Sequence, residues 1–133
     1  MKLTSKSEYA LLAMVFLARN HGKGMISVQK IAEAQGIPPK FLEQILLILK
    51  RARFLKSMKG HDGGYSLSIP PEKVNLAQII RLFDGALAPT ESVSKYFYEP
   101  TPVEKEKGIV KVLKNIRDYV SDKLENTTLR DVI

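Results

Sequence analysis

A glycine and two prolines separate two helical segments in the first half of this chain. Ser27 is a suitable N-cap for a short amphipathic helix that ends at Gly36. Pro38 and Pro39 then open a longer helix that extends to about Arg53, because proline suits the first turn, where its missing N–H is not needed. Two helices joined by a tight glycine-containing turn are the outline of a helix-turn-helix, although other helical hairpins share it.

Helical periodicity predicts a further helix on each side of this pair. The first covers residues 5–20, with Ser5-Lys6-Ser7-Glu8 as a capping box. Its apolar residues at helical spacing are Tyr9, Leu12, Phe16 and Leu17. The other begins after Asn75 and ends at Gly85. Its apolar residues at i, i+3, i+4 and i+7 are Leu76, Ile79, Ile80 and Phe83.

Between the third helix, which ends at about Arg53, and the helix that begins after Asn75, the sequence changes to a period of two. Residues 54–59 and 65–69 have the pattern of short strands, and the glycine-rich segment 60–64 joins them. We therefore predict a β-hairpin directly after the helix-turn-helix. A hairpin in that position is a wing.

The C-terminal third divides into a loop and a long helix. Residues 86–101 show no clear period and contain two prolines, whereas residues 102–125 predict one helix that is too long for a small domain to cover. The uncovered apolar stripe needs a partner helix. We therefore assign dimerisation to Ile109, Val112, Leu113, Ile116, Tyr119, Val120 and Leu124.

The predicted fold class is mainly α with a small β-hairpin wing. It consists of a winged helix-turn-helix DNA-binding domain over residues 1–85, a loop or hinge over 86–101, and a dimerisation helix with a C-terminal segment over 102–133.

The excess of positive over negative charge lies entirely in one half of the chain. Residues 1–69 hold eleven Lys/Arg against four Asp/Glu, a net charge of +7, whereas residues 70–133 hold ten of each. Such asymmetry favours a polyanionic partner. Five cations without an intervening acid straddle the end of the third helix and the hairpin, where DNA phosphates would lie: Lys50, Arg51, Arg53, Lys56 and Lys59. The alternatives are a solvated charged face and a module that docks an acidic protein.

Three residues near the start of the third helix carry groups that can read base edges. Gln44 can pair bidentately with adenine, Lys40 can reach guanine, and Glu43 can accept a hydrogen bond from cytosine. For Glu43 an ion pair with Lys40 or Lys50 is the equal alternative.

Other classes of function find little support. The chain has no cysteine, and no apolar run is long enough to span a bilayer. The N-terminus does not have the pattern of a secretory signal, so we expect a cytoplasmic protein without a membrane partner. The glycines of segment 60–64 do not match a phosphate-binding loop. His61 and Asp62 beside Ser57 do not make a credible catalytic trio. His21 and His61 lie in different elements, so a metal site would need carboxylates from elsewhere. We expect neither an enzyme nor a metal site.

Several motifs together resemble one family of bacterial transcription regulators. Residues 41–46 read FLEQIL and residues 59–67 read KGHDGGYSL, close to the family patterns Y-L-E-Q-I and R-G-x-x-G-G-Y-x-L. The opening 3–10, the segment 79–85 and the tail 126–129 also match. The chain thus resembles the Rrf2 family over nearly its whole length.

The resemblance implies a homodimer joined by the long C-terminal helix, acting on double-stranded DNA at a pseudo-palindromic operator. It further implies a repressor of iron-sulphur or of cysteine and sulphur metabolism genes, with Lys59 at the minor groove. Two positions depart from the pattern, since Lys59 replaces the usual arginine and Arg53 the usual glycine after the recognition helix. Taken together, the expected DNA contacts are Ser27, Gln29, Pro39, Lys40, Glu43, Gln44, Lys50, Arg51, Lys56, Lys59 and Gly60.

The family's cofactor ligands are missing. Relatives that bind an iron-sulphur cluster carry three cysteines in the loop before the dimer helix, whereas Ser92 stands at the first position and Tyr98 and Glu104 lie near the others. A native cluster-free member and a chain whose cysteines were replaced both fit this sequence. We expect no cofactor, and a loop that serves a regulatory protein or a small effector.

Overall fold

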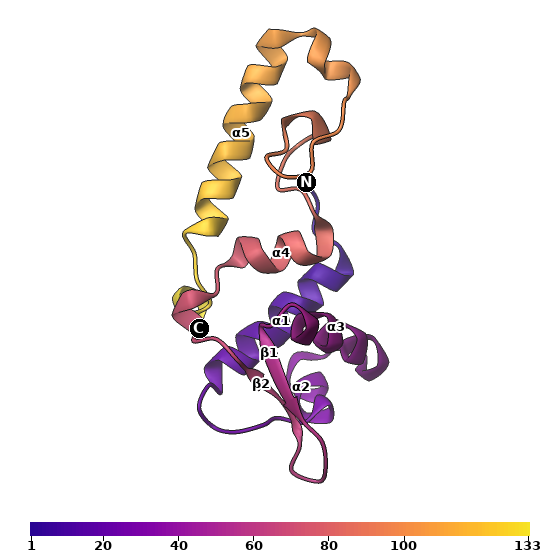
Figure 1. Ribbon diagram of the computed structural model, residues 1–133, viewed down its shortest axis with the longest axis vertical. Helices are drawn as coiled ribbons and strands as arrows, with labels where there is room; N and C mark the ends of the chain where they lie inside the picture. The colour runs from indigo at the N-terminus through magenta and orange to yellow at the C-terminus, as the bar shows by residue number, and fades with distance from the viewer.

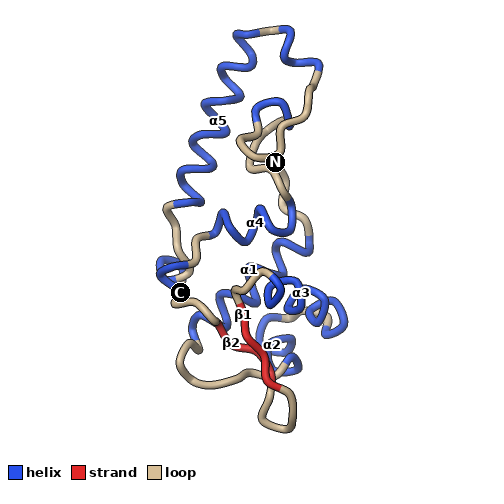
Figure 2. The backbone as a smooth tube through the Cα atoms, viewed as in Figure 1, coloured by secondary structure: helices blue, strands red, loops and turns tan.

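A computed structural model describes all residues 1–133 as five α-helices and a two-stranded antiparallel sheet (Figure 1). The elements are α1 (Ser5–Arg19), α2 (Val28–Gln35), α3 (Pro39–Arg51), β1 (Leu55–Met58), β2 (Gly64–Leu67), α4 (Leu76–Asp84) and α5 (Lys107–Glu125). The first three helices and the hairpin form one end of the molecule, and α5 with the preceding loop forms the other, with α4 between them (Figures 1 and 2). The predicted winged-helix fold is confirmed.

The helix-turn-helix has the caps that the sequence predicts. The Ser27 side chain accepts the N–H of Lys30 at 3.2 Å, and Gly36 ends α2 in the left-handed conformation with φ of 65°. The inner face of α3 is fully buried, and its residues are Leu42, Ile45, Leu46 and Leu49. These leucines and the isoleucine share one core with residues of α1, α2 and the hairpin.

The start and the inner face of α1 differ from the prediction. Thr4, not Ser5, is the N-cap, and its hydroxyl accepts the N–H of Ser7 at 3.2 Å while donating to the Asp84 carboxylate. Leu12 is 41% exposed. α2, α3, α4 and β2 all contact α1. Its buried hydrophobic residues are three alanines and two larger side chains: Ala10, Ala13, Ala18, Met14 and Leu17.

The wing has a third extended segment that periodicity does not reveal. β1 and β2 pair from Leu55 opposite Leu67 to Met58 opposite Gly64. Ile26, just before α2, pairs with Tyr65 through two backbone hydrogen bonds of 2.9 and 2.8 Å. These bonds join the start of β2, beside the wing turn, to the entrance of α2.

The prediction of a single helix over residues 102–125 is wrong for its first turn. Residues Pro102–Lys105 form a separate 3-10 turn, and Glu106 is extended with φ of −114° and ψ of 95°. The Thr101 N–H donates to the Glu104 carboxylate at 3.2 Å, which closes this turn on itself. The remaining helix, α5, is on the order of 28 Å long at 1.5 Å per residue.

The chain returns to the helix-turn-helix end of the molecule after α5. Leu129 is fully buried in the main core, and its N–H donates to the Val74 carbonyl at 2.9 Å. An ion pair of 2.7 Å between Arg81 and Glu125 joins α4 to the end of α5. The division at residue 102 therefore does not separate two hydrophobic cores, because the tail contributes to the first one.

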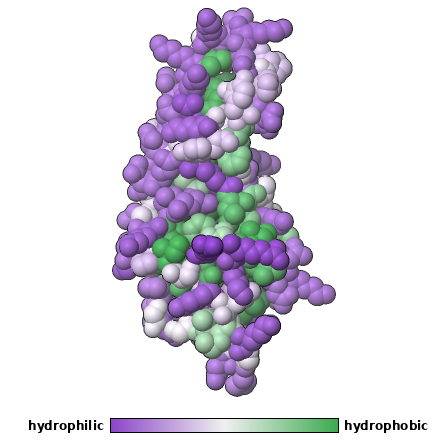
Figure 3. All heavy atoms as spheres, viewed as in Figure 1, coloured by the Kyte–Doolittle hydropathy of each residue, from purple (hydrophilic) through white to green (hydrophobic).

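The surface is mostly hydrophilic on the face in Figure 3, where apolar atoms show as patches over the middle of the molecule and near its top. No helix combines the length and the apolar character needed to cross a membrane.

Candidate nucleic-acid interface

The outer face of α3 is free of the rest of the chain. Opposite the four buried residues lie six exposed ones, which are Lys40, Glu43, Gln44, Leu47, Lys50 and Arg51. Glu43 has no ion-pair partner within 4.0 Å, so the alternative of a pair with Lys40 or Lys50 is not formed. The base-reading groups predicted for this helix are thus available to a partner.

The structure exposes every residue to which DNA contact was assigned. Ser27 and Gln29 lie at the start of α2, Pro39 to Arg51 on α3, and Lys56 to Gly60 on β1 and the wing turn. Two of them have local roles as well. Ser27 caps α2 with its oxygen, which leaves its hydroxyl proton free to donate, and Gln29 donates to the Glu33 carboxylate at 2.9 Å. The assignment of DNA contacts itself stays a prediction.

Arg53 adds a cation between α3 and the wing at a conformational cost. Its φ is 69°, the left-handed region that glycine tolerates and side chains disfavour. The N–H of Phe54 bonds to the Leu49 carbonyl at 3.0 Å and the N–H of Arg53 to the Lys50 carbonyl at 2.9 Å. This pair of bonds is a Schellman motif, which requires a left-handed residue at the position of Arg53.

We expect Arg53→Gly to stabilise the fold and weaken DNA binding. Relief of the left-handed strain should raise the free energy of unfolding by about 1 kcal/mol, or the midpoint of thermal unfolding by about 3–5 °C. Loss of one cation should lower affinity for duplex DNA severalfold. Arg53→Lys is the matched control, since it keeps both the charge and the strain and should change neither property. A lower melting temperature for Arg53→Gly would contradict the strain argument.

The wing turn has no feature of a catalytic or phosphate-loop site. Its backbone closes with a bond of 3.1 Å from the N–H of Gly63 to the carbonyl of Gly60, and a strand follows it. No hydrogen bond links His61, Asp62 and Ser57. The wing can present Lys56 on β1 and Lys59 in the turn, both exposed, to a phosphate backbone.

The apolar stripe of α5 divides into two parts. Ile109, Val112, Ile116 and Tyr119 are 50%, 56%, 45% and 76% exposed, whereas Leu113 and Val120 are half-buried. Leu124 packs against the small cluster of Ala77, Ile80 and Leu87 in its own chain. The surface open to a partner is therefore the exposed four, with Leu113 and Val120 at its edge.

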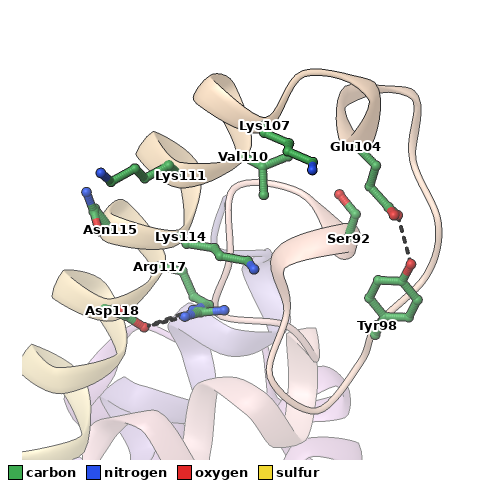
Figure 4. A pocket seen from close by; sticks show the side chains of 10 residues that line it. All are labelled: Ser92, Tyr98, Glu104, Lys107, Val110, Lys111, Lys114, Asn115, Arg117 and Asp118. Atoms are coloured by element: carbon green, nitrogen blue, oxygen red, sulfur yellow. Dashed lines mark hydrogen bonds and ion pairs between the residues drawn. The ribbon is translucent and has the colours of Figure 1, made fainter.

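Ser92, at the family's first ligand position, comes together with Tyr98 and Glu104, which lie near the other two positions, but not as a set of ligands. Ser92, Tyr98 and Glu104 line one cavity of about 680 Å³ (Figure 4). The hydroxyls of Ser92 and Thr101 share a hydrogen bond of 2.5 Å, and the Tyr98 hydroxyl donates to Glu104 at 2.9 Å. That bond and the nearby carboxylates raise the pKa of Tyr98.

These oxygen donors do not fit an iron-sulphur cluster, whose irons are normally held by thiolates. No group of three or more His, Cys, Asp or Glu side chains is arranged to hold a metal ion.

Sequence reasoning missed several positions that organise these surfaces. Gly64 approaches the Ile26 backbone so closely that a Cβ would overlap its carbonyl. Arg117, on the inner side of α5, donates to the Val93 carbonyl at 2.9 Å and pairs with Asp118 at 2.7 Å, which ties the loop to the helix. A single arginine in an amphipathic helix gives no local indication of such a bond.

Comparison with known proteins gives a consistent result. The family model Rrf2, described as an iron-dependent transcriptional regulator, matches residues 3–133. The HTH-type transcriptional regulator CymR of Bacillus subtilis is 34% identical over 99% of this chain and 89% of its own length. IscR of Aliivibrio salmonicida is 35% identical over 71% of this chain and 56% of its own length.

Solved structures agree with the sequence matches. CymR of B. subtilis, described as its global cysteine regulator, superposes with a TM-score of 0.80 at 32% identity, covering 99% of this chain and 95% of that one. T. potens IscR gives a TM-score of 0.72 at 32% identity, covering 99% and 85%.

Proposed function

The chain belongs to the Rrf2 family of HTH-type, DNA-binding transcription regulators, which are not enzymes, and we propose that it is a homodimeric repressor acting on a pseudo-palindromic operator. The observation that carries the proposal is the free outer face of α3. It offers three base-reading groups, and exposed cations without an ion-pair partner lie on the same helix, on the turn after it and on the wing. Backbone cations position such a helix in a major groove, and the base-reading groups select the sequence.

The homodimer rests on the exposed part of α5. Its four apolar residues repeat at steps of three and four, the pattern of a helix that packs against a second helix. A two-fold dimer would place two copies of α3 about one helical turn of DNA apart, or a multiple of it. The operator should then be an inverted repeat.

The target genes are proposed from the relatives. CymR is described as a global cysteine regulator, and this chain shares with it nearly its whole length. We place the protein in the cytoplasm, at genes of cysteine and sulphur metabolism, with genes of iron-sulphur metabolism as the second choice. The absence of cysteine favours the first, because a regulator without thiolates is poorly suited to carry a cluster.

Selection from a random duplex library should enrich an inverted repeat. Six exposed cations lie on α3, the Arg53 turn and the wing, namely Lys40, Lys50, Arg51, Arg53, Lys56 and Lys59. If roughly six phosphates are neutralised, affinity for the enriched duplex should fall by about 10³ between about 50 and 200 mM salt. Binding is measured by fluorescence anisotropy against a scrambled duplex as control.

Two outcomes would contradict the proposal. Absence of any enriched sequence would favour a module that docks an acidic protein through the same cations. An enriched sequence without two-fold symmetry would support DNA binding but contradict recognition of the operator by a two-fold homodimer.

A further inference from the structure

The cavity between α5 and the loop before it carries more positive charge than the chain itself neutralises. Eight of its ten lining residues are polar or charged, and four of them are the cations Lys107, Lys111, Lys114 and Arg117. Its volume of about 680 Å³ is in the range of small-molecule sites. A lining this polar favours a charged ligand over an apolar one.

The two carboxylates of the cavity are already engaged. Glu104 accepts from the Tyr98 hydroxyl at 2.9 Å and from the Thr101 N–H at 3.2 Å. Asp118 accepts from two nitrogens of Arg117 at 2.9 and 2.7 Å. By contrast, none of the three lysines has an acidic partner within 4.0 Å. The lining thus has four cations against two carboxylates, a net charge of +2, and its three ammonium groups have no ion-pair partner that would compete with an anion.

The side chains are directed in a way that suits an anion. Figure 4 shows Lys107 and Lys114 extending from α5 toward the segment that carries Ser92, whereas Lys111 and Asn115 extend away from it. Lys107 is the first residue of α5, whose N-terminus has no side-chain cap. The positive end of the helix dipole therefore adds to the two ammonium groups.

One wall of the cavity is fixed before any ligand arrives. Arg117 holds the loop through the Val93 carbonyl at 2.9 Å, and Ser92 is held by the Thr101 hydroxyl at 2.5 Å. The cavity also lies off the surface proposed for dimerisation. None of the four exposed apolar residues of α5 lines it. A dimer joined through that stripe leaves the cavity accessible.

We propose that this cavity binds a small dianion, a phosphate monoester or a dicarboxylate, between Lys107, Lys114 and the Ser92 hydroxyl. The ligand would act as an effector, because it connects the start of α5 to the loop, and the end of α5 is tied to α4 by the Arg81–Glu125 pair. As an effector the ligand would change the affinity for the operator, and only this part of the proposal rests on the proposed function.

The test is direct titration of the purified protein by calorimetry. Glycerol 3-phosphate and malate distinguish the two anion classes, inorganic phosphate tests the minimal group, and glycerol is the neutral control. At about 0.1 M ionic strength, we expect saturable binding of one dianion class and none of glycerol. In the variant Lys107→Gln with Lys114→Gln, the dissociation constant should rise at least about tenfold.

The control variant is Lys95→Gln with Lys105→Gln. It removes the same charge from exposed lysines that do not line the cavity, and its affinity for the anion should equal that of the unmodified protein. The paired variants should keep the melting temperature, since Lys107 and Lys114 are exposed and unpaired. No saturable binding of any of the three anions would overturn the proposal, as would equal weakening by both variants.

Operator binding measured with and without the anion separates this proposal from the regulator function. If the protein selects no operator but binds the anion through Lys107 and Lys114, the anion site is supported and the repressor function is contradicted. Operator binding that the anion leaves unchanged would overturn the effector role.

Discussion

Replacing Val112 and Ile116 with aspartate is expected to give a folded monomer that has lost its operator. Both side chains are about half exposed in the single chain, so the substitutions leave no cavity in its core. In the dimer they would place four unpaired carboxylates in an apolar seam, which is prohibitively costly. Sedimentation should show one protomer, and circular dichroism should show unchanged helix content.

The loss of operator affinity should be far larger than the loss of any single DNA contact. Two recognition helices held in one dimer bind a palindrome with an avidity gain of about 10²–10⁴, and a monomer forfeits it. Lys111→Asp with Asn115→Asp is the control, since it places two aspartates at exposed polar positions of the same turns, beside the apolar stripe and not in it. That variant should remain dimeric. A dimeric Val112/Ile116 variant would show that the exposed stripe is not the interface.

The recognition helix was predictable because its determinants are local. Ser27, Gly36 and Pro39 fix where α2 and α3 begin and end, and a strict helical period sorts buried from exposed residues along α3. Once the ends and the period are known, the outer face follows without knowledge of the rest of the chain. The family motifs then assign that face to DNA.

The C-terminal helix was predicted less well because its determinants are tertiary. Residues 103–107 are mostly good helix formers, yet the chain forms the closed turn of Thr101 and Glu104 and is extended at Glu106. Leu124 belongs to the same apolar stripe as Ile116, but α4 covers the former and leaves the latter exposed. A periodic pattern identifies an apolar face and does not say which part its own chain will cover.

The cavity lay beyond sequence reasoning for a different reason. Ser92, Tyr98 and Glu104 come from a loop without a period, and Lys107 and Lys114 read as ordinary solvated charges on α5. Their meeting depends on the path of the loop, which Arg117 holds to the helix through the carbonyl of Val93. The resemblance did indicate Ser92, but as the position of a metal ligand and not as part of a basic cavity.

The start of β2, beside the wing turn, makes one close approach to another backbone segment. Gly64 has φ of 144°, and its Cα faces the Ile26 carbonyl at the point where Ile26 and Tyr65 exchange their hydrogen bonds. Gly60, at the tip of the same wing, also has a positive φ of 107° but open space around it. The two glycines therefore separate the cost of backbone strain from the cost of a steric clash.

Gly64→Ala is expected to lower the free energy of unfolding by about 3 kcal/mol, and Gly60→Ala by only about 1 kcal/mol. Both alanines incur the strain of a positive φ, but the Gly64 methyl group must also displace the Ile26 backbone and break the bonds to Tyr65. Urea unfolding followed by circular dichroism, at equal protomer concentration, measures both values. Because Ile26 immediately precedes the α2 N-cap, Gly64→Ala should also weaken operator binding through misplacement of the wing against the helix-turn-helix. Equal losses of stability for the two alanines would show that the Ile26 backbone moves away from the new methyl group without a free-energy cost.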